Sequence, residues 1–419
     1  MISDTRVRRP RDRDDSPGSP SRNASLPAVL AALTLAVALV GATVLLFSVR
    51  DPADDSPPRP APTEESQAAD DALQRRVLSE LDVFTDWLAR NRVEGYVGEV
   101  GIPNDGDVDR WIQLAELWFQ EADEAALWVD VWSSGEWWGA DYVYSVFVPG
   151  TEGGPLAATT PTGELLARYA REGDEPRGVN VSGGEFGAPG STEEVTEFSN
   201  QNPGEYGTDY LYDSQGSFDY LASQGIDTVR LPFRWERIQP ALGEALDDDE
   251  LSRLRGAVSR AHTAGLEVIL DVHNYGAYHL AEGTRGVRRA IGSDELGQGD
   301  FADLWRRLSD AFREEPGVIG YGLMNEPSIL PAVGDRSPAQ VWEEASQAAV
   351  TAIRAGGDDT LIMVAGYQYS HAGEWSRQHP QAWIEDPADN VRYEAHHYWK
   401  RDDGYSYDRE VAHAEDLGY

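Results

Sequence analysis

Two glutamates, Glu99 and Glu326, lie within or directly after short apolar segments, where a charged side chain is costly unless the chain opens into a polar cleft. Their local sequences are Gly98-Glu99-Val100-Gly101 and Leu323-Met324-Asn325-Glu326-Pro327. A pair of carboxyl groups can cleave a glycosidic bond, because one protonates the leaving oxygen while the other attacks or stabilises the sugar carbon from the opposite side. Each glutamate also has a plainer interpretation: an acid near a helix start for Glu326, and a solvated acid in a turn for Glu99. The chemistry therefore depends on folding that brings the two together.

Further polar residues interrupt or follow apolar segments. Arg230 lies inside such a segment and needs an anionic partner, which would be either a catalytic carboxylate or the other half of a structural ion pair. The pairs His273-Asn274 and His396-His397, the latter followed by Tyr398, place imidazole rings beside other hydrogen-bonding groups. A metal site would also use histidines, but the chain has no His-Glu-x-x-His pattern and no cysteine. We therefore expect neither a metal nor a cofactor, and the histidines can equally be structural.

Several aromatic residues fall near predicted strand ends: Trp132, Trp137, Trp138, Trp235 and Tyr275. Flat aromatic faces suit the apolar faces of sugar rings. Other tryptophans, namely Trp87, Trp118 and Trp305, fall in helical patterns and are expected in the core. The aromatic content therefore supports a sugar cleft without defining one.

The elements that must position these residues alternate between strands and helices. The predicted strands are Tyr96–Gly101, Ala126–Trp132, Gly178–Ser182, Thr228–Phe233, Glu267–Asn274, Ile319–Asn325, Leu361–Gly366 and Val391–Tyr398. Helical patterns lie between them at Leu251–Ala264, Phe301–Arg313 and Val341–Arg354. This alternation predicts an α/β protein with a (β/α)8 barrel, in which side chains at the carboxyl ends of the strands meet on one face.

The overall charge excludes one class of partner. The 419 residues include 73 acidic and 35 basic side chains, a formal net charge of -38. Phosphate binding needs a cationic face, so we expect no nucleic-acid partner, whereas a neutral glycan meets no such objection.

The N-terminal part of the chain is predicted to be separate from the barrel. Residues 26–49 form a nearly unbroken apolar run that is long enough to cross a bilayer as a helix. The arginine-rich head, residues 1–25, precedes it and acidic residues follow it, so the positive-inside rule places the head in the cytoplasm and the rest outside. A cleaved secretory signal is the alternative. Residues 50–71 are proline-rich and acidic, which predicts an extended linker to a domain spanning residues 72–419.

Several segments together resemble glycoside hydrolase family 5, and most nearly its endo-β-1,4-glucanases. They are Arg177–Phe186, Val229–Glu236, Leu270–Tyr275, Leu323–Pro327, which is similar to the acid/base motif, and Tyr393–Tyr398, which is similar to the His-x-Tyr strand. The segments similar to the C-terminal part of the family come first in this chain: Phe84–Asn91, Gly98–Gly101 and Val131–Gly139. The resemblance thus implies a circularly permuted barrel, with the family's C-terminal part in residues 72–176 and its N-terminal part in residues 177–419.

The resemblance also implies a mechanism and roles. Glu99 would be the nucleophile of a retaining double displacement, and Glu326 the general acid and then base. The residues implied to support the nucleophile are Arg230, His396 and Tyr398. Asn325 would bind the sugar 2-hydroxyl, and His273 and Trp132 would line the cleaved subsite.

The expected protein is thus a cofactor-free, monomeric endo-hydrolase of a β-1,4-glucan polysaccharide, held at the membrane with its catalytic domain outside. Two alternatives stay open. One is an endo-hydrolase of another β-glycan, such as mannan or mixed-linkage glucan, and the other is a glycan-binding surface protein without catalysis.

Overall fold

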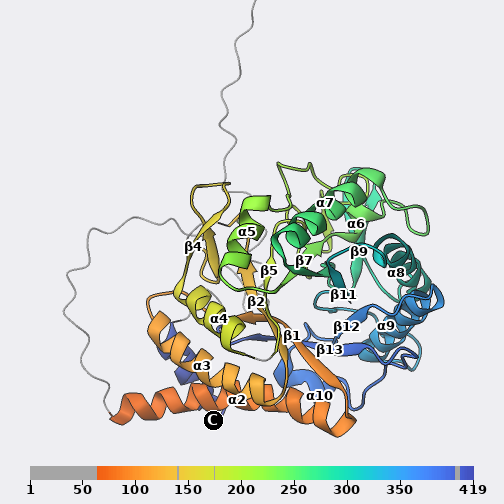
Figure 1. Ribbon diagram of the computed structural model, residues 1–419. Coiled ribbons are helices and arrows are strands. Elements are labelled where there is room, and N and C mark those ends of the chain that lie inside the picture. The colour runs from red at the N-terminus through yellow and green to blue at the C-terminus, as the bar shows by residue number, and fades with distance from the viewer. Residues whose placement is uncertain (1–63, 139–140, 174, 402–405) are drawn as a thin grey trace, which may run out of the picture.

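The computed structural model describes residues 64–138, 141–173, 175–401 and 406–419, with side chains from Ala72 onward (Figure 1). The predicted head, the predicted membrane segment and most of the predicted linker lie outside these residues. Among the described residues, no helix combines the length and the apolar character needed to cross a bilayer.

The central feature is a closed barrel of parallel strands in the order β1-β13-β12-β11-β8-β7-β5-β2 (Figure 1). Their bounds are β1 Glu94–Gly101, β2 Trp128–Ser134, β5 Arg177–Val181, β7 Thr228–Phe233, β8 Glu267–Val272, β11 Val318–Gly322, β12 Leu361–Ala365 and β13 Val391–Tyr398. The predicted barrel and its eight strands are confirmed. Strand β12 is continuously apolar because one of its faces packs inside the barrel and the other packs against helices.

Some predicted strand ends are wrong. Strand β8 ends at Val272 and β11 at Gly322, so His273 and Asn325 belong to the loops beyond the strands. Strand β2 runs from Trp128 to Ser134, later than predicted. The apolar pattern continues past the strand ends because the first loop residues are also buried, so the pattern alone does not mark where pairing stops.

Helices surround the barrel (Figure 1). They are α2 Glu64–Asn91, α3 Val108–Glu124, α4 Pro161–Glu172, α5 Gln215–Ser223, α6 Trp235–Ile238, α7 Asp248–Ala264, α8 Gln298–Phe312, α9 Pro338–Ala355, the 3-10 turn η1 Ala372–Glu374, α10 Trp375–Gln378 and α11 Tyr407–Asp416. Helix α9 shows why such helices start where they do: Ser337 and Gln340 form a capping box around Pro338. Helix α2 begins at Glu64, so the prediction of an extended linker as far as residue 71 is wrong, because strong helix formers such as Glu, Gln and Ala already fill residues 64–71.

Two small hairpin sheets lie outside the barrel and were not predicted. Strand β10 (Arg285–Ala290) pairs with β9 (Ala277–Glu282) on one side and with β6 (Val195–Thr196) on the other, and β3 (Phe147–Pro149) pairs with β4 (Leu156–Thr159). The β9–β10 hairpin follows β8 in the chain, so it stands on the face where the carboxyl ends of the strands meet.

Large aromatic residues fill the layer between strands and helices. Trp87, Trp118 and Trp305 have no exposed surface, which confirms them as core residues. Trp235 is equally buried and its indole nitrogen donates to Gln239 at 2.9 Å, so the prediction that its ring faces a sugar is wrong. Trp305 donates to the carbonyl of Leu323 at 3.0 Å and thereby holds the segment that leads to Glu326.

The first and last described elements pack against each other. Strand β1 lies between β13 and β2, and α2 packs against α11. Arg76 of α2 reaches Glu410 of α11 at 3.1 Å and also the carbonyl of Trp399, which follows β13. The side chain of Glu410 has no exposed surface, so this pair is a buried ionic tie between the two ends of the domain.

We predict that Glu410→Ala lowers the free energy of unfolding by about 3–5 kcal/mol, because it leaves Arg76 buried without its main anion. Urea unfolding followed by circular dichroism measures the change. Asp408→Ala is a matched control on the same helix: its side chain is 80% exposed, and we expect an effect within about 0.5 kcal/mol. Equal effects of the two substitutions would contradict the buried tie.

Candidate active site

A β-bulge at Gly98 turns Glu99 into the barrel. Val97 pairs with Ala395 and Glu99 pairs with His396, so Gly98 is an extra residue in β1. In a regular strand Glu99 would point the same way as Val97, toward the helices, because side chains alternate between faces. The extra residue reverses this alternation from Glu99 onward. Glu99 is therefore aimed at the same interior as the side chains of β13.

Glu99 is buried, with 3% of its surface exposed, and has three polar neighbours from two strands. Arg230 Nη1 donates to its Oε1 at 3.0 Å, and the Tyr398 hydroxyl donates to its Oε2 at 2.6 Å. His396 Nδ1 lies 3.6 Å from the same Oε2. The interpretation of Glu99 as a solvated acid in a turn is therefore wrong.

Glu326 lies just beyond β11, in the left-handed backbone region with a φ of 44°. Its Oε1 lies 3.0 Å from His396 Nδ1. One carboxylate oxygen of Glu99, one of Glu326 and a ring nitrogen of His396 all lie within 4.8 Å of one another. The plainer interpretation as a helix-start acid is wrong, since the next helix, α9, begins at Pro338. Folding thus brings the two predicted glutamates together.

His273, Asn325 and Trp132 form the adjoining wall. Asn325 bridges two predicted residues: its Oδ1 accepts from Arg230 at 2.9 Å, and its Nδ2 lies 3.0 Å from His273 Nε2. His273 Nδ1 in turn lies 2.9 Å from Asp271 Oδ2. Trp132 stacks on the His273 ring with centroids 5.8 Å apart. Burial lowers the pKa of His273 well below its ordinary value, so the neutral ring donates to Asp271 and accepts from Asn325.

The site contains residues that sequence reasoning did not select. Arg230 Nη2 lies 3.0 Å from Asp271 Oδ1 and 3.1 Å from Glu394 Oε1, and its Nη1 donates to Asn180 Oδ1 at 2.8 Å. Arg230 is therefore the centre of a network rather than half of a simple ion pair. A signal was present for the two acids, because Asp271 precedes His273 by two residues and Glu394 precedes His396 by two, which puts each on the same strand face as its histidine.

Non-glycine residues with positive φ concentrate in the loops around Glu326: Tyr275 at 55°, Ile329 at 52°, Gln368 at 67°, Tyr369 at 60° and Ser370 at 56°. Arg288 of β10 holds two of these loops, because its guanidinium donates to the carbonyls of Tyr275 at 3.2 Å and of Ser328 at 3.0 Å. Such conformations persist only where the surroundings enforce them, and they are common at functional sites. Sequence gave no signal for Arg288, since its partners come from distant loops.

Burial and neighbouring charges shift the pKa values of His396, Arg230 and Glu326. Burial opposes the charge of His396, but Glu99, Glu326 and Glu394 raise its pKa to about 10, so it is an imidazolium at neutral pH. Burial also opposes the charge of Arg230, yet Asp271, Glu394 and Glu99 hold its pKa well above the ordinary value. Burial and the charge of Glu99 raise the pKa of Glu326 to about 7 against the opposing effect of His396. Glu326 can therefore carry a proton at neutral pH.

The spacing of Glu99, Glu326 and His396 would also allow these three groups to hold a cation. The cationic Arg230 and His396 already neutralise this region. The arrangement thus fits proton transfer between carboxyl groups better than metal binding.

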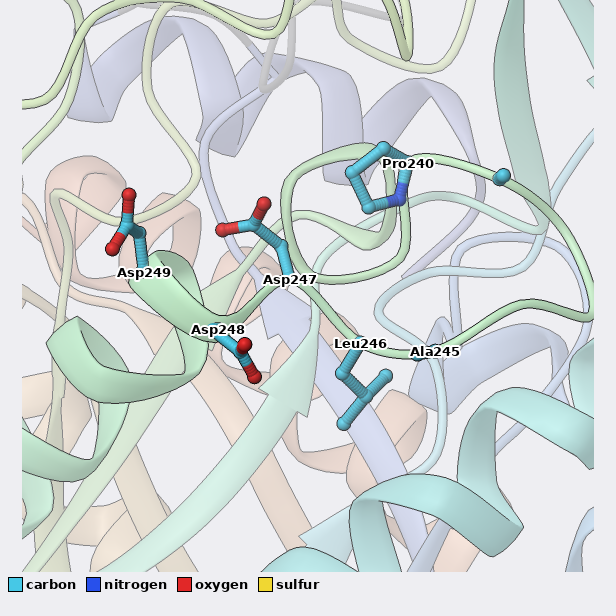
Figure 2. Close-up of a pocket in the computed structure, with 7 residues that line it drawn as sticks. Pro240, Ala245, Leu246, Asp247, Asp248 and Asp249 are labelled. Atoms are coloured by element: carbon cyan, nitrogen blue, oxygen red, sulfur yellow. The ribbon is translucent and has the colours of Figure 1, made fainter.

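A separate open pocket lies where the chain enters α7 (Figure 2). It is lined by Pro240, Ala241, Ala245, Leu246, Asp247, Asp248 and Asp249. Asp247 caps the helix by accepting from the Glu250 amide at 2.9 Å, and acidic residues are favourable in a first helical turn. The acids of this pocket are explained by the helix start, and the pocket contains none of the predicted site residues.

The closed parallel barrel and the two buried carboxyl groups, one near the end of β1 and one just beyond β11, define the class of a (β/α)8 glycoside hydrolase. The sequence pattern of the family described as "Cellulase (glycosyl hydrolase family 5)" matches residues 182–415, which is more than half of the chain. The chain therefore belongs to glycosyl hydrolase family 5.

Individual relatives are similar over part of their length. The probable endo-β-1,4-glucanase B of Aspergillus oryzae is 29% identical over 233 residues, which is 54% of this chain and 59% of that protein. Endo-β-1,4-glucanase B of Emericella nidulans is 30% identical over 216 residues, which is 51% of this chain and 60% of that protein. The solved structure of endoglucanase Cel5A from Pseudomonas stutzeri is similar with 39% identity and a TM-score of 0.44. The match covers 52% of this chain and 58% of that chain. The chain thus spans about three fifths of the relatives it matches.

We predict that Glu326 titrates near pH 7 and that Glu99→Gln lowers its pKa, because the substitution removes the negative charge that disfavours a second carboxylate. Titration of the glutamate side-chain carbons by 13C NMR measures both values, with Glu326→Gln identifying the resonance. A wild-type pKa near the ordinary value of about 4.3 would contradict the described burial.

Proposed function

We propose that this protein is a retaining endo-β-1,4-glucanase, with Glu99 as the nucleophile and Glu326 as the acid/base. The observation that carries the proposal is that one carboxylate oxygen of Glu99 and one of Glu326 lie within 4.8 Å of each other. Carboxyl groups about 5–5.5 Å apart favour attack by a carboxylate, whereas about 6.5–9.5 Å leaves room for an intervening water. The close spacing therefore supports retention over inversion.

In the first step, Glu99 attacks the anomeric carbon while the bond from that carbon to the leaving oxygen breaks. Glu326 gives its proton to that oxygen, so the departing chain leaves as a neutral alcohol and a glycosyl ester forms on Glu99. The raised pKa of Glu326 supports this role, because the acid must be protonated when the substrate binds.

In the second step, a water attacks the same carbon, Glu326 takes the water's proton, and the ester bond to Glu99 breaks. Once Glu99 is esterified it has no charge, so the repulsion that raised the pKa of Glu326 disappears. Glu326 then loses its proton more readily, which suits a general base.

The remaining site residues support these steps. Arg230 and Tyr398 each donate a hydrogen bond to Glu99 and so fix the orientation of its carboxyl group. Asn325 uses one amide hydrogen toward His273, which leaves its other hydrogen for a sugar 2-hydroxyl. Trp132 offers an aromatic edge beside His273 to the sugar ring.

The proposed substrate class rests on the relatives, which are endo-β-1,4-glucanases by name. The catalytic groups would act equally on another β-glycan, so mannan and mixed-linkage glucan are the competing substrates. A glycan-binding protein without turnover is a weaker candidate, because both carboxyl groups and their supporting network are present.

We further infer that the family order is rotated in this chain. The family pattern begins at Ser182, yet β1 and β2 lie before it and complete the same barrel. Glu99, on the first strand, takes the position that the resemblance gives to the nucleophile near the end of the family's sequence. A closed barrel tolerates such a rotation, since its first and last strands are neighbours.

We also propose that residues 26–49 anchor the protein in the membrane with the catalytic domain outside, or direct its export if they are cleaved. Fractionation of cells that produce the full chain, followed by N-terminal sequencing of the mature protein, separates the two outcomes.

We predict that the protein releases reducing ends from carboxymethylcellulose and that Glu326→Ala lowers this rate about 10²–10⁴-fold. An aryl β-cellobioside with a 2,4-dinitrophenyl leaving group should be far less affected by this variant, because that group departs without a proton. Glu99→Gln should abolish cleavage of both substrates. Unchanged hydrolysis by Glu99→Gln would remove Glu99 from the mechanism.

The same assay on mannan and on mixed-linkage glucan separates the candidate substrates. A faster rate on either would replace the β-1,4-glucan assignment. Binding of glycan with no release of reducing ends would favour the non-catalytic alternative.

We predict that the chain can be reopened at the β3–β4 turn, before Gly153, and rejoined by a glycine-serine linker from Tyr419 to Ala72 without loss of activity. The physical reason is that α2 and α11 already pack together, so the linker joins neighbouring elements. Circular dichroism and reducing-end release measure folding and activity. An unfolded or inactive product would contradict the rotation.

A further inference from the structure

We propose that Glu394 is a positioning residue that sets His396 and Arg230 against both catalytic glutamates. This inference rests on the proposed function. Glu394 lies on β13, inside the barrel, and has no exposed surface. It touches neither Glu99 nor Glu326 in any described hydrogen bond or ion pair, so its influence must pass through its two cationic partners.

The contacts of Glu394 converge on one oxygen. Its Oε1 lies 3.2 Å from His396 Nε2 and 3.1 Å from Arg230 Nη2. The opposite sides of these two cations face the catalytic groups: His396 Nδ1 lies 3.0 Å from Glu326, and Arg230 Nη1 lies 3.0 Å from Glu99. A single buried carboxylate therefore fixes the position of both cations at once.

The barrel is shaped to admit this carboxylate. A Cβ built on Gly98 would lie 2.0 Å from Glu394 Oε1, so any side chain at the bulge would displace it. The bulge that aims Glu99 and the space that holds Glu394 thus depend on the same glycine. Burying a charge in this way is costly without strong partners. Arg230 and His396 meet that cost, since against the effect of burial they hold the pKa of Glu394 below its ordinary value.

Asp271 provides a useful contrast. It also contacts Arg230, but its other oxygen binds His273 rather than His396. Asp271 therefore orients the wall formed by His273 and Asn325, whereas Glu394 contacts His396 on the side away from Glu326. Because His396 lies between the two catalytic glutamates, a change at Glu394 should alter turnover more than substrate binding.

The test compares Glu394→Gln, Glu394→Leu and Asp130→Asn in the full-length protein. Glutamine keeps an acceptor oxygen and removes the charge, whereas leucine removes both. Asp130 is a matched control, because it is a buried carboxylate in the same barrel whose hydrogen bond goes to the Tyr96 hydroxyl at 2.6 Å and not to a catalytic residue. Folded protein is quantified by circular dichroism before each assay.

We expect Glu394→Leu to lower kcat on carboxymethylcellulose roughly 10–100-fold with little change in KM, and Glu394→Gln to lower it less. Asp130→Asn should keep the wild-type kcat. Equal losses for the glutamine and leucine variants would show that Glu394 positions the two cations through its charge rather than through an acceptor oxygen. A wild-type kcat for Glu394→Leu would overturn the positioning role.

A second measurement does not depend on activity. The imidazole 1H–15N NMR signals of His396, assigned with His396→Asn, should shift in both Glu394 variants and not in Asp130→Asn. If the wild-type protein hydrolyses none of the glycans, the proposed function fails, and these signals still decide the positioning claim. Unshifted His396 signals in Glu394→Leu would overturn it.

Discussion

The buried guanidinium of Arg230 is the interaction on which the site depends. It gathers carboxylates from three other strands or strand ends, Glu99, Asp271 and Glu394, none of which could be ionised inside the barrel without a cation. Asn180 and Asn325 complete its shell. Arg230 thereby links three groups into one charged network: the nucleophile candidate Glu99, Asp271 with the neighbouring His273, and Glu394 with the neighbouring His396.

Barrel closure gives this network its second cation. His396 comes from β13, the strand beside β1, and their pairing sets it opposite Glu99. The bulge at Gly98 is needed for this register, since an uninterrupted strand would turn Glu99 toward the helices. The bulge at Gly98 and the pairing of β1 with β13 are thus both needed to place Glu99 beside His396.

The sequence predicted the strands and the fold class because short apolar runs alternate with helical patterns. The grouping of the eight selected residues followed from polar residues near the strand ends and from the family resemblance. It could not predict Asn180 as a partner of Arg230, since Asn180 has no distinctive neighbours in sequence. The anchoring of the loops by Arg288 and the bulge at Gly98 also depend on tertiary contacts. For Trp235 the sequence predicted a contact that the structure does not have. An aromatic residue near a strand end can be buried in the core instead of facing a sugar.

Between Arg76 and Asn91, helix α2 runs from the carboxyl end of β13, where Arg76 meets Trp399, to the amino end of β1, which begins at Glu94. The part of the helix around Arg76 therefore lies beside the rim that carries the catalytic groups. About 14 residues separate the apolar segment from α2, and at roughly 3.5 Å each they span at most about 50 Å. If the proposed anchor is retained, the length of this tether limits how far the domain can move from the membrane, so cleavage would be confined to polymer near the cell surface.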